Sequence, residues 1–365
     1  MIDYELLCRL NAGSANERLS ALEEAVKTAD FPAMDERMIN NHIHTTYSFS
    51  PYSPAAAVYA ARAEGLCTAG IVDHDSIGGA EEFIAAGKIV GIPTTIGVET
   101  RVSFAGTALE HKRTNNPDQV GISYMVLHGI PHENIEKVKV YFALYRKARN
   151  ERNRKMVERI NAAYNTDIDF DRDVLPLSMY SDGGSVTERH LMLALAKKLN
   201  KESKPGLEGM LAEYDLVGKL KKEAIAQIYI DADEECPPLA EFVSFAKEVN
   251  GILAYAYLGD VTQSVTGDKK AQKFEDDYLD ELFEILHNAG VRAVTYMPTR
   301  NTPEQLARLR ALCDKYGMLQ ISGEDINSPR QSFVIEKMKD PAFANLIEST
   351  WQIIDHENGG KKHEE

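Results

Sequence analysis

The chain has 365 residues, of which 44% are hydrophobic and 27% are charged, as in an ordinary soluble globular protein. This length can bury a large core within a single domain that carries an insertion. The formal net charge of −15 makes binding of duplex nucleic acid unfavourable, because such binding needs many lysines and arginines against the phosphates. A small phosphorylated substrate is still compatible with this charge, since bound divalent cations can invert the local potential.

Targeting signals are not evident in the sequence. No stretch approaches the roughly 18 uninterrupted apolar residues of a membrane span, and residues 1–5 lack the basic region of a signal peptide. The four cysteines, Cys8, Cys67, Cys236 and Cys313, are far apart and form no C-x-x-C pair. This spacing argues against a disulfide framework or a thiolate zinc site and favours a reducing compartment. We therefore expect a cytoplasmic protein without membrane association.

The first half of the chain begins with a helical pattern and continues as strands and helices in alternation. Residues 1–36 form a predicted helical extension, with apolar residues at helical spacing. A first helix after the extension should begin at Ser53-Pro54, an N-cap followed by a proline at the first helical position, and end at Gly65. A second helix is expected at 79–89. The strands expected in this half are 38–44, 69–72, 93–104 and 123–128.

The middle of the chain has a different composition. Residues 134–239 are charged and rich in helical pattern, which predicts a helical insertion after the fourth strand. Two basic runs, at 146–149 and 152–155, lie in it. We interpret these runs as a solvated helix face in preference to a surface that steers phosphate.

The alternation of strands and helices resumes over residues 240–355, and residues 356–365 are expected to be a disordered tail. The expected helices are 241–249, 277–288 and 303–317, and the expected strands are 252–257, 291–296 and 318–322. Seven strands with intervening helices are typical of parallel βα units, which predicts an α/β fold in two parts, residues 37–133 and 240–355. Periodicity alone does not distinguish a closed barrel from an open doubly wound sheet.

Residues that commonly bind metals fall near the ends of these strands. His42 and His44 are two residues apart, so in a strand they point to the same face, although an exposed pair beside a loop would read alike. Imidazoles and carboxylates that converge from successive strand ends are typical of Zn, Mn or Fe sites. The further candidates are His74 after the second strand, Glu99 within the third, His128 at the end of the fourth, and Asp325 after the seventh.

Together these motifs resemble the PHP (polymerase and histidinol phosphatase) family. Its opening H-x-H matches His42 and His44, its T-D-H-D matches residues 72–75, and its G-x-E ends at Glu99. The family's strand-end histidine matches His128, and its closing G-S-D-x-H matches residues 323–327. The resemblance covers about residues 37–335. It implies a distorted (β/α)7 TIM-like barrel and a metal-dependent phosphoesterase that holds two or three ions.

Three of the family's ligand positions are substituted in this chain. Phe49 stands where the family has an acidic residue or histidine, Tyr257 stands for a histidine, and Asn327 replaces the last histidine. The resemblance therefore implies one complete metal site, a weakened second site and a lost third site. The complete site would use His42, His44, Glu99 and Asp325. The second site would use Glu99 and His128, together with the position of Tyr257. The third site would use the position of Phe49, His74 and the position of Asn327.

The resemblance extends into the insertion, where the family's T-R-P-H-I-A stands as residues 187–192. His190 matches the family histidine, while Glu188 replaces its arginine and Arg189 its proline. His190 could contact the substrate, or it could have a purely structural role at the start of a helix. Arg189 could supply the positive charge that the family's arginine provides. Asp73 is either a residue that orients a ligand histidine or a loop acid bonded to backbone.

The leading hypothesis for function is hydrolysis of a phosphate ester of a small metabolite or nucleotide by a metal-bound hydroxide. The resemblance implies one tightly bound divalent ion (Zn, Mn or Fe) and one bound more weakly, with His128, His190 and Arg189 assisting catalysis. The substitutions at Phe49, Tyr257 and Asn327 support an alternative, a catalytically impaired metal- or ligand-binding protein. Amide hydrolysis or sugar isomerisation at the same metal centre is a third possibility, which no residue favours.

Overall fold

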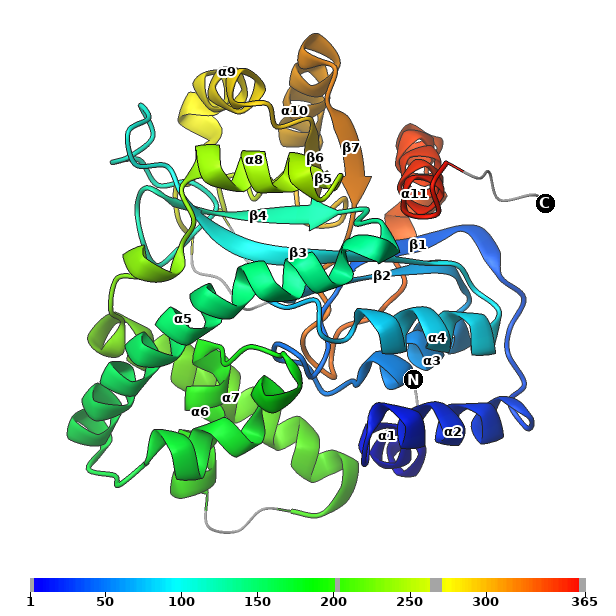
Figure 1. Ribbon diagram of the computed structural model, residues 1–365, viewed down its shortest axis with the longest axis vertical. Coiled ribbons are helices and arrows are strands. Elements are labelled where there is room, and N and C mark those ends of the chain that lie inside the picture. The colour runs from blue at the N-terminus through cyan, green and yellow to red at the C-terminus, as the bar shows by residue number, and fades with distance from the viewer. Residues whose placement is uncertain (1–2, 201–203, 263–270, 361–365) are drawn as a thin grey trace.

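The computed structural model describes residues 3–200, 204–262 and 271–360. Two helices come first, α1 (Tyr4–Asn11) and α2 (Ala15–Val26), in the part of the chain predicted as a helical extension. Ser14 and Glu17 form a capping box at the start of α2. A buried ion pair between Arg18 and Glu82 ties α2 to the barrel helix α4 (Ala80–Val90), so the two N-terminal helices are fixed against the barrel (Figure 1).

Seven strands form one sheet in chain order, and the sheet curls into a nearly closed barrel. Ile43 and Ile326 form an isolated parallel bridge that brings the first strand beside the chain that follows the last one. The prediction of a seven-stranded α/β barrel is confirmed. The strands are β1 (Asp35–Ile43), β2 (Leu66–His74), β3 (Thr94–Ser103), β4 (Ile122–His128), β5 (Ile252–Ala256), β6 (Ala293–Tyr296) and β7 (Leu319–Ser322).

One strand departs from the expected parallel arrangement. β4 runs antiparallel to both β3 and β5, with Gly97 opposite His128 and Ser103 opposite Ile122. The connection between β3 and β4 contains turns and bends but no helix. Parallel neighbours are usually joined by a crossover that contains a helix, and residues 104–121, which join these two strands, contain none. The expectation of uniformly parallel strands is therefore wrong for β4.

Helices cover the outside of the barrel and bury their apolar faces in its main core. The first of them begins as the sequence predicts, because the side chain of Ser53 accepts a hydrogen bond from the backbone of Ala56 and Pro54 occupies the first turn. Gly65, which follows this helix, has a φ of 86°, a conformation that glycine adopts readily. Besides α4, the covering helices are α3 (Pro54–Ala63), α8 (Leu239–Glu248), α9 (Leu279–Ala289), α10 (Pro303–Tyr316) and α11 (Ala344–Glu357).

Besides α8, the β4–β5 segment (residues 129–251) contains three helices that extend from one side of the barrel in Figure 1: α5 (Ile135–Tyr164), α6 (Glu188–Leu199) and α7 (Gly206–Ile228). The beginning of α5 packs in the barrel core through Val138 and Phe142, whereas its second half contributes Met156 and Ile160 to a separate hydrophobic cluster with α6 and α7. The remaining elements are short 3-10 or π turns: η1 (His132–Asn134), η2 (Phe170–Val174), η3 (Leu175–Leu177), η4 (Tyr180–Asp182), η5 (Asp233–Glu235), η6 (Asp276–Tyr278), η7 (Glu336–Lys339) and η8 (Pro341–Phe343).

The last helix, α11, is bonded to three strands of the barrel. Thr350 accepts a hydrogen bond from Asn41 of β1 (2.8 Å), and Ser349 donates one to the carbonyl of Gln320 in β7 (2.5 Å). Glu357 is buried and accepts a hydrogen bond from the backbone of Ile96 in β3 (2.8 Å). α11 thus continues past the expected start of the disordered tail at residue 356, and residues 361–365 lie outside the described residues. Among the described helices, none has the length and hydrophobicity that crossing a membrane requires.

Candidate metal centre

Three of the predicted ligands, His42, His44 and Glu99, lie together, with one ligand atom of each within 4.8 Å of the others, and Asp325 approaches His44. Nε2 of His42 lies 3.6 Å from Oε1 of Glu99, and Nε2 of His44 lies 3.5 Å from Oε2 of the same carboxylate. The Nε2 atom of His44 is also 3.4 Å from Oδ1 of Asp325. Both histidines and Glu99 are buried, while 41% of the Asp325 side chain is exposed, so solvent reaches the cluster from the Asp325 side.

The spacing of these atoms fits a divalent ion. In a tetrahedral site with bonds of about 2.0–2.1 Å, neighbouring ligand atoms are separated by about 3.3–3.5 Å. The separations of 3.4–3.6 Å are close to that value and too long for hydrogen bonds of ordinary geometry. Within the described parts of the chain, Nε2 of His44 is buried without a hydrogen-bond partner. Since a buried polar atom left unsatisfied costs about 1–3 kcal/mol, a cation between these ligands would remove that cost.

His128 reaches the barrel interior through strand register. β4 is antiparallel to β3, so the carboxyl ends of the two strands point in opposite directions. In the register of the sheet, His128 pairs with Gly97, which lies two residues before Glu99. Neither ring nitrogen of His128 has a hydrogen-bond partner among the described residues. Burial, aided by the charge of His42, lowers the pKa of His128 to about 3. A buried, neutral imidazole with free nitrogens is a suitable metal ligand.

His74, at the end of β2, approaches the same carboxylate. Its Nδ1 lies 3.1 Å from Oε2 of Glu99, and its ring centroid is 4.6 Å from that of His44. Burial lowers the pKa of His74 well below its usual value, and the charge of Arg149 acts in the same direction. Like His128, His74 is therefore neutral.

The three substituted ligand positions have other partners in the fold. The amide of Asn327 donates a hydrogen bond to Oδ1 of Asp325 at 2.6 Å, so it orients a ligand. The buried Tyr257 donates its hydroxyl to Oδ1 of Asp276 at 2.7 Å, and burial together with this bond raises its pKa. Phe49 packs edge-on against the ring of His190, with centroids 5.1 Å apart. Where the family has metal ligands, Phe49 therefore packs against His190 and Tyr257 is bonded to Asp276.

Asp73 is bonded to the loop that follows β1 and, through Ser48, lies near the ring of His44. It accepts hydrogen bonds from the backbone N–H and hydroxyl of Thr45 (2.6 and 2.5 Å) and from the hydroxyl of Ser48 (2.5 Å). The Ser48 hydroxyl is 3.3 Å from Nδ1 of His44, the ring nitrogen opposite to the one that faces Glu99. Burial raises the pKa of Asp73, against the opposing effects of His44, Ser48 and Thr45. Ser48 was missed in the sequence, where the only signal was a run of hydroxyl residues after H-x-H.

His190 and Arg189 lie beside Phe49. Nδ1 of His190 accepts a hydrogen bond from the backbone of Thr187 at 3.0 Å, which caps α6. Burial and the charge of Arg149 lower the pKa of His190 to about 3, so the ring is neutral with its proton on Nε2. The guanidinium carbon of Arg189 is 5.9 Å from the centroid of the Phe49 ring.

The prediction that the basic runs form a solvated helix face is wrong for three arginines. Arg146, Arg149 and Arg152 recur every three residues on one face of α5, and the structure buries that face. Arg149 donates a hydrogen bond to Glu188 at 3.1 Å, and Arg152 donates one to Glu235 at 2.7 Å.

Six buried residues from the barrel and the β4–β5 segment form this arginine network: Arg101, Arg149, Arg152, Asp75, Glu188 and Glu235. Its three positive and three negative charges balance. Although burial opposes ionisation, the three arginines lower the pKa of Glu188 well below its ordinary value. The acidic partners are far from α5 in sequence, so the pattern of the helix alone did not indicate them.

Comparison with known proteins adds to this geometry. A sequence model of the PHP domain matches residues 40–292. A structure from Bifidobacterium adolescentis, named as a "putative metal-dependent phosphoesterase", aligns with a TM-score of 0.60 and 21% identity over 87% of this chain and 98% of its own. An amidohydrolase from Chromobacterium violaceum, with bound sulfate and no metal, aligns with a TM-score of 0.59 and 18% identity over 81% of this chain and 89% of its own. These two similarities support the fold.

One curated protein, the 5'-3' exoribonuclease of Haemophilus influenzae, is 37% identical over 68 residues. The match spans 19% of this chain and 25% of that relative. It therefore concerns only a part of either protein.

Proposed function

Because the chain belongs to the PHP family, we propose that it is a metal-dependent phosphoesterase that hydrolyses a phosphate ester of a small metabolite or nucleotide. The observation that carries this proposal is the buried Nε2 of His44, which lacks a hydrogen-bond partner within the described residues and lies at ligand separation from Glu99 and Asp325. His42, His44, Glu99 and Asp325 would hold one ion tightly. His128 and His74, with the shared Glu99, would hold a second ion more weakly.

When bound, a divalent ion supplies a water of lowered pKa and positive charge beside the phosphoryl oxygens. The residues around the site would prepare it for that task. Asp73 and Ser48 fix the ring of His44, and Asn327 fixes the carboxylate of Asp325. Histidine ligands favour Zn, Mn or Fe over Mg, which prefers oxygen ligands.

His190 and Arg189 would act on the substrate at the edge of the site. The neutral ring of His190 accepts a hydrogen bond at Nδ1, so its Nε2–H is the donor that could reach a phosphate or leaving oxygen. Together with Thr46, Phe49 and Ser50, His190 lines a small cavity of about 50 Å³. Arg189, which is partly exposed, would supply positive charge from one position after the family's arginine.

The alternative is a metal-binding protein without turnover. It is favoured by the packing of Phe49 against His190 and by the hydrogen bond from Tyr257 to Asp276. Because of these contacts, two positions that bind metal in the family have no metal-binding side chain here. Fewer ions would clamp the phosphate oxygens less well.

The deciding experiment is metal analysis of protein purified without chelators, followed by assay on a panel of phosphate esters with added Mn²⁺. We expect about one tightly bound ion per chain and turnover of at least one ester that depends on the ion. A folded, metal-loaded protein that is inactive on the whole panel with several metals would establish the binding protein instead. Three stoichiometric ions would contradict the proposed ligand count.

A further inference from the structure

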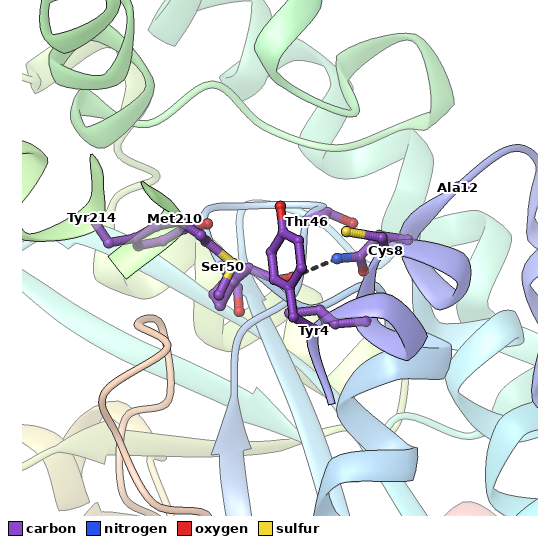
Figure 2. A pocket seen from close by; sticks show the side chains of 10 residues that line it. Tyr4, Cys8, Ala12, Thr46, Ser50, Met210 and Tyr214 are labelled. Carbon is purple, nitrogen blue, oxygen red and sulfur yellow. Dashed lines mark hydrogen bonds between the residues drawn. The ribbon is translucent and has the colours of Figure 1, made fainter. Parts of the chain in front are cut away.

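A cavity of about 380 Å³ lies where three parts of the chain meet, one of them the loop that follows the ligand candidate His44. Figure 2 shows α1 on one side, α7 on the other, and the loop that follows β1 between them. Its volume is within the range of about 300–1,000 Å³ that is common for small-molecule sites. The walls include Tyr4, Leu7 and Cys8 from α1, Thr46, Ser50 and Pro51 from the loop, and Met210 and Tyr214 from α7.

The loop under this cavity is the one that leaves the metal centre. Thr46 is two residues beyond the ligand candidate His44, a span of at most about 7 Å. Thr46, Ser50 and Tyr214 also line the 50 Å³ cavity that contains His190, so the two cavities share a wall. A leaving group held near His190 would therefore have the larger cavity next to it.

The walls have a definite chemical character. The residues that line the cavity include none with a charged side chain. Tyr4 and Tyr214 offer aromatic rings, Met210 a polarisable thioether, and Thr46 and Ser50 a few hydroxyl groups. Aromatic and thioether walls with few polar groups suit a flat, uncharged aromatic ligand, whereas a second charged group would find no partner.

Hydrogen bonds hold α1 to the same loop. The amide of Asn11 donates to the carbonyl of Pro51 at 2.7 Å, and its oxygen accepts from the backbone of Ser53 at 2.7 Å. The hydroxyl of Ser53 donates to the carbonyl of Leu10 at 2.6 Å. The wall that α1 contributes is thus positioned relative to the loop that carries His44.

We propose that this cavity binds the leaving group of the substrate and that the N-terminal helix α1 selects for an uncharged aromatic one. The inference rests on the proposed phosphoesterase function and adds a substrate class to it. The metal centre would act on the phosphate, and the ring would lie between Tyr4 and Tyr214.

The test uses a bulky side chain at an exposed position of α1. Cys8→Trp should fill the cavity, and Arg9→Trp, at an exposed neighbour that does not line it, is the matched control. The first measurement is saturation-transfer NMR with 2-naphthol as an uncharged aromatic probe, without added metal. Wild type and Arg9→Trp should bind the probe, and Cys8→Trp should lose at least about tenfold in affinity.

The second measurement compares two phosphate esters. With Mn²⁺, Cys8→Trp should raise KM for 1-naphthyl phosphate at least about tenfold and leave that for methyl phosphate unchanged. The cavity proposal is wrong, and the phosphoesterase function stands, if wild type turns over esters but does not bind 2-naphthol. The same holds if the Cys8→Trp variant binds 2-naphthol as well as wild type does. If no ester is turned over but Cys8→Trp still abolishes binding of 2-naphthol, the function fails and the cavity remains an aromatic site.

Discussion

Two buried polar clusters lie side by side in this protein, and they differ in how their atoms are satisfied. In the metal centre, Nε2 of His44 and both ring nitrogens of His128 have no hydrogen-bond partner within the described residues. In the arginine network, each of the guanidinium groups of Arg101, Arg149 and Arg152 donates hydrogen bonds to two carboxylates. Asp75 belongs to the network and directly follows His74, so the two clusters are adjacent along the chain.

The contrast indicates what each cluster is for. Buried polar atoms without partners are costly, and a bound ligand can remove that cost, whereas the charged groups of the network are paired with one another and only Nε of Arg149 among its guanidinium nitrogens is buried without a hydrogen bond in the described structure. We therefore interpret the metal centre as the site of chemistry and the network as the junction that holds α5 and α6 on the barrel. The sequence had favoured a solvated helix face for these basic runs, and the structure instead buries Arg149 and Arg152.

The largest expected effect is the removal of a ligand from the metal centre. Glu99→Gln and His44→Ala should each abolish retention of the tight ion and lower activity by about 10³-fold or more, because the ion supplies the activated water. Elemental analysis and turnover with Mn²⁺ measure both effects. His111→Ala, at an exposed histidine outside the cluster, is the control and should change neither. Full metal occupancy in either ligand variant would contradict the assignment.

Breaking the arginine network should instead lower the free energy of unfolding. Glu235→Ala leaves the buried charges of Arg101 and Arg152 short of a partner and should cost about 3–5 kcal/mol in urea denaturation. Asp171→Asn, which breaks the exposed pair with Arg154, should leave the midpoint almost unchanged, because solvent screens such pairs. Equal effects of the two variants would refute the structural role of the network.

A smaller effect is expected from the residues that orient a ligand. Ser48→Ala removes the hydroxyl between Asp73 and Nδ1 of His44 and should weaken metal affinity by about 10–100-fold without abolishing binding. Competition with a fluorescent chelator would measure the change. Ser123→Ala, at a buried serine that bonds to Thr114, provides the matched control. Unchanged affinity in Ser48→Ala would mean that His44 does not need this support.

The smallest effect concerns pH. The pKa of Glu188 is lower in the folded state than in the unfolded chain, so its contribution to stability is complete above the unfolded pKa of about 4.5 and is lost as pH falls. Between pH 6 and pH 3.5 the melting temperature of the wild type should fall more steeply than that of Glu188→Gln, which cannot be protonated. Parallel curves would show that Glu188 does not carry the charge assigned to it.

Local patterns were sufficient for much of this fold. The predicted strands and most barrel helices are present, because the apolar runs, the Ser53-Pro54 start and glycines such as Gly65 act on their own neighbours. The direction of β4 was missed, although the lack of a helical pattern between the third and fourth strands was a usable signal. His128 nevertheless lies in the barrel interior, because residues opposite each other in the register face the same side of a sheet whichever way the strands run.

The sequence by itself determined the seven strands, the H-x-H pair and the motif residues that point to a metal centre, since each depends on spacing within one short segment. Only the tertiary structure decided which polar side chains are satisfied and which are not. The burial of Arg149 against Asp75 and Glu188 and the bond from Asn327 to Asp325 are examples of what the sequence patterns did not show. The physical reason is that hydrogen-bond satisfaction and desolvation depend on how side chains are arranged in space, often between residues far apart along the chain.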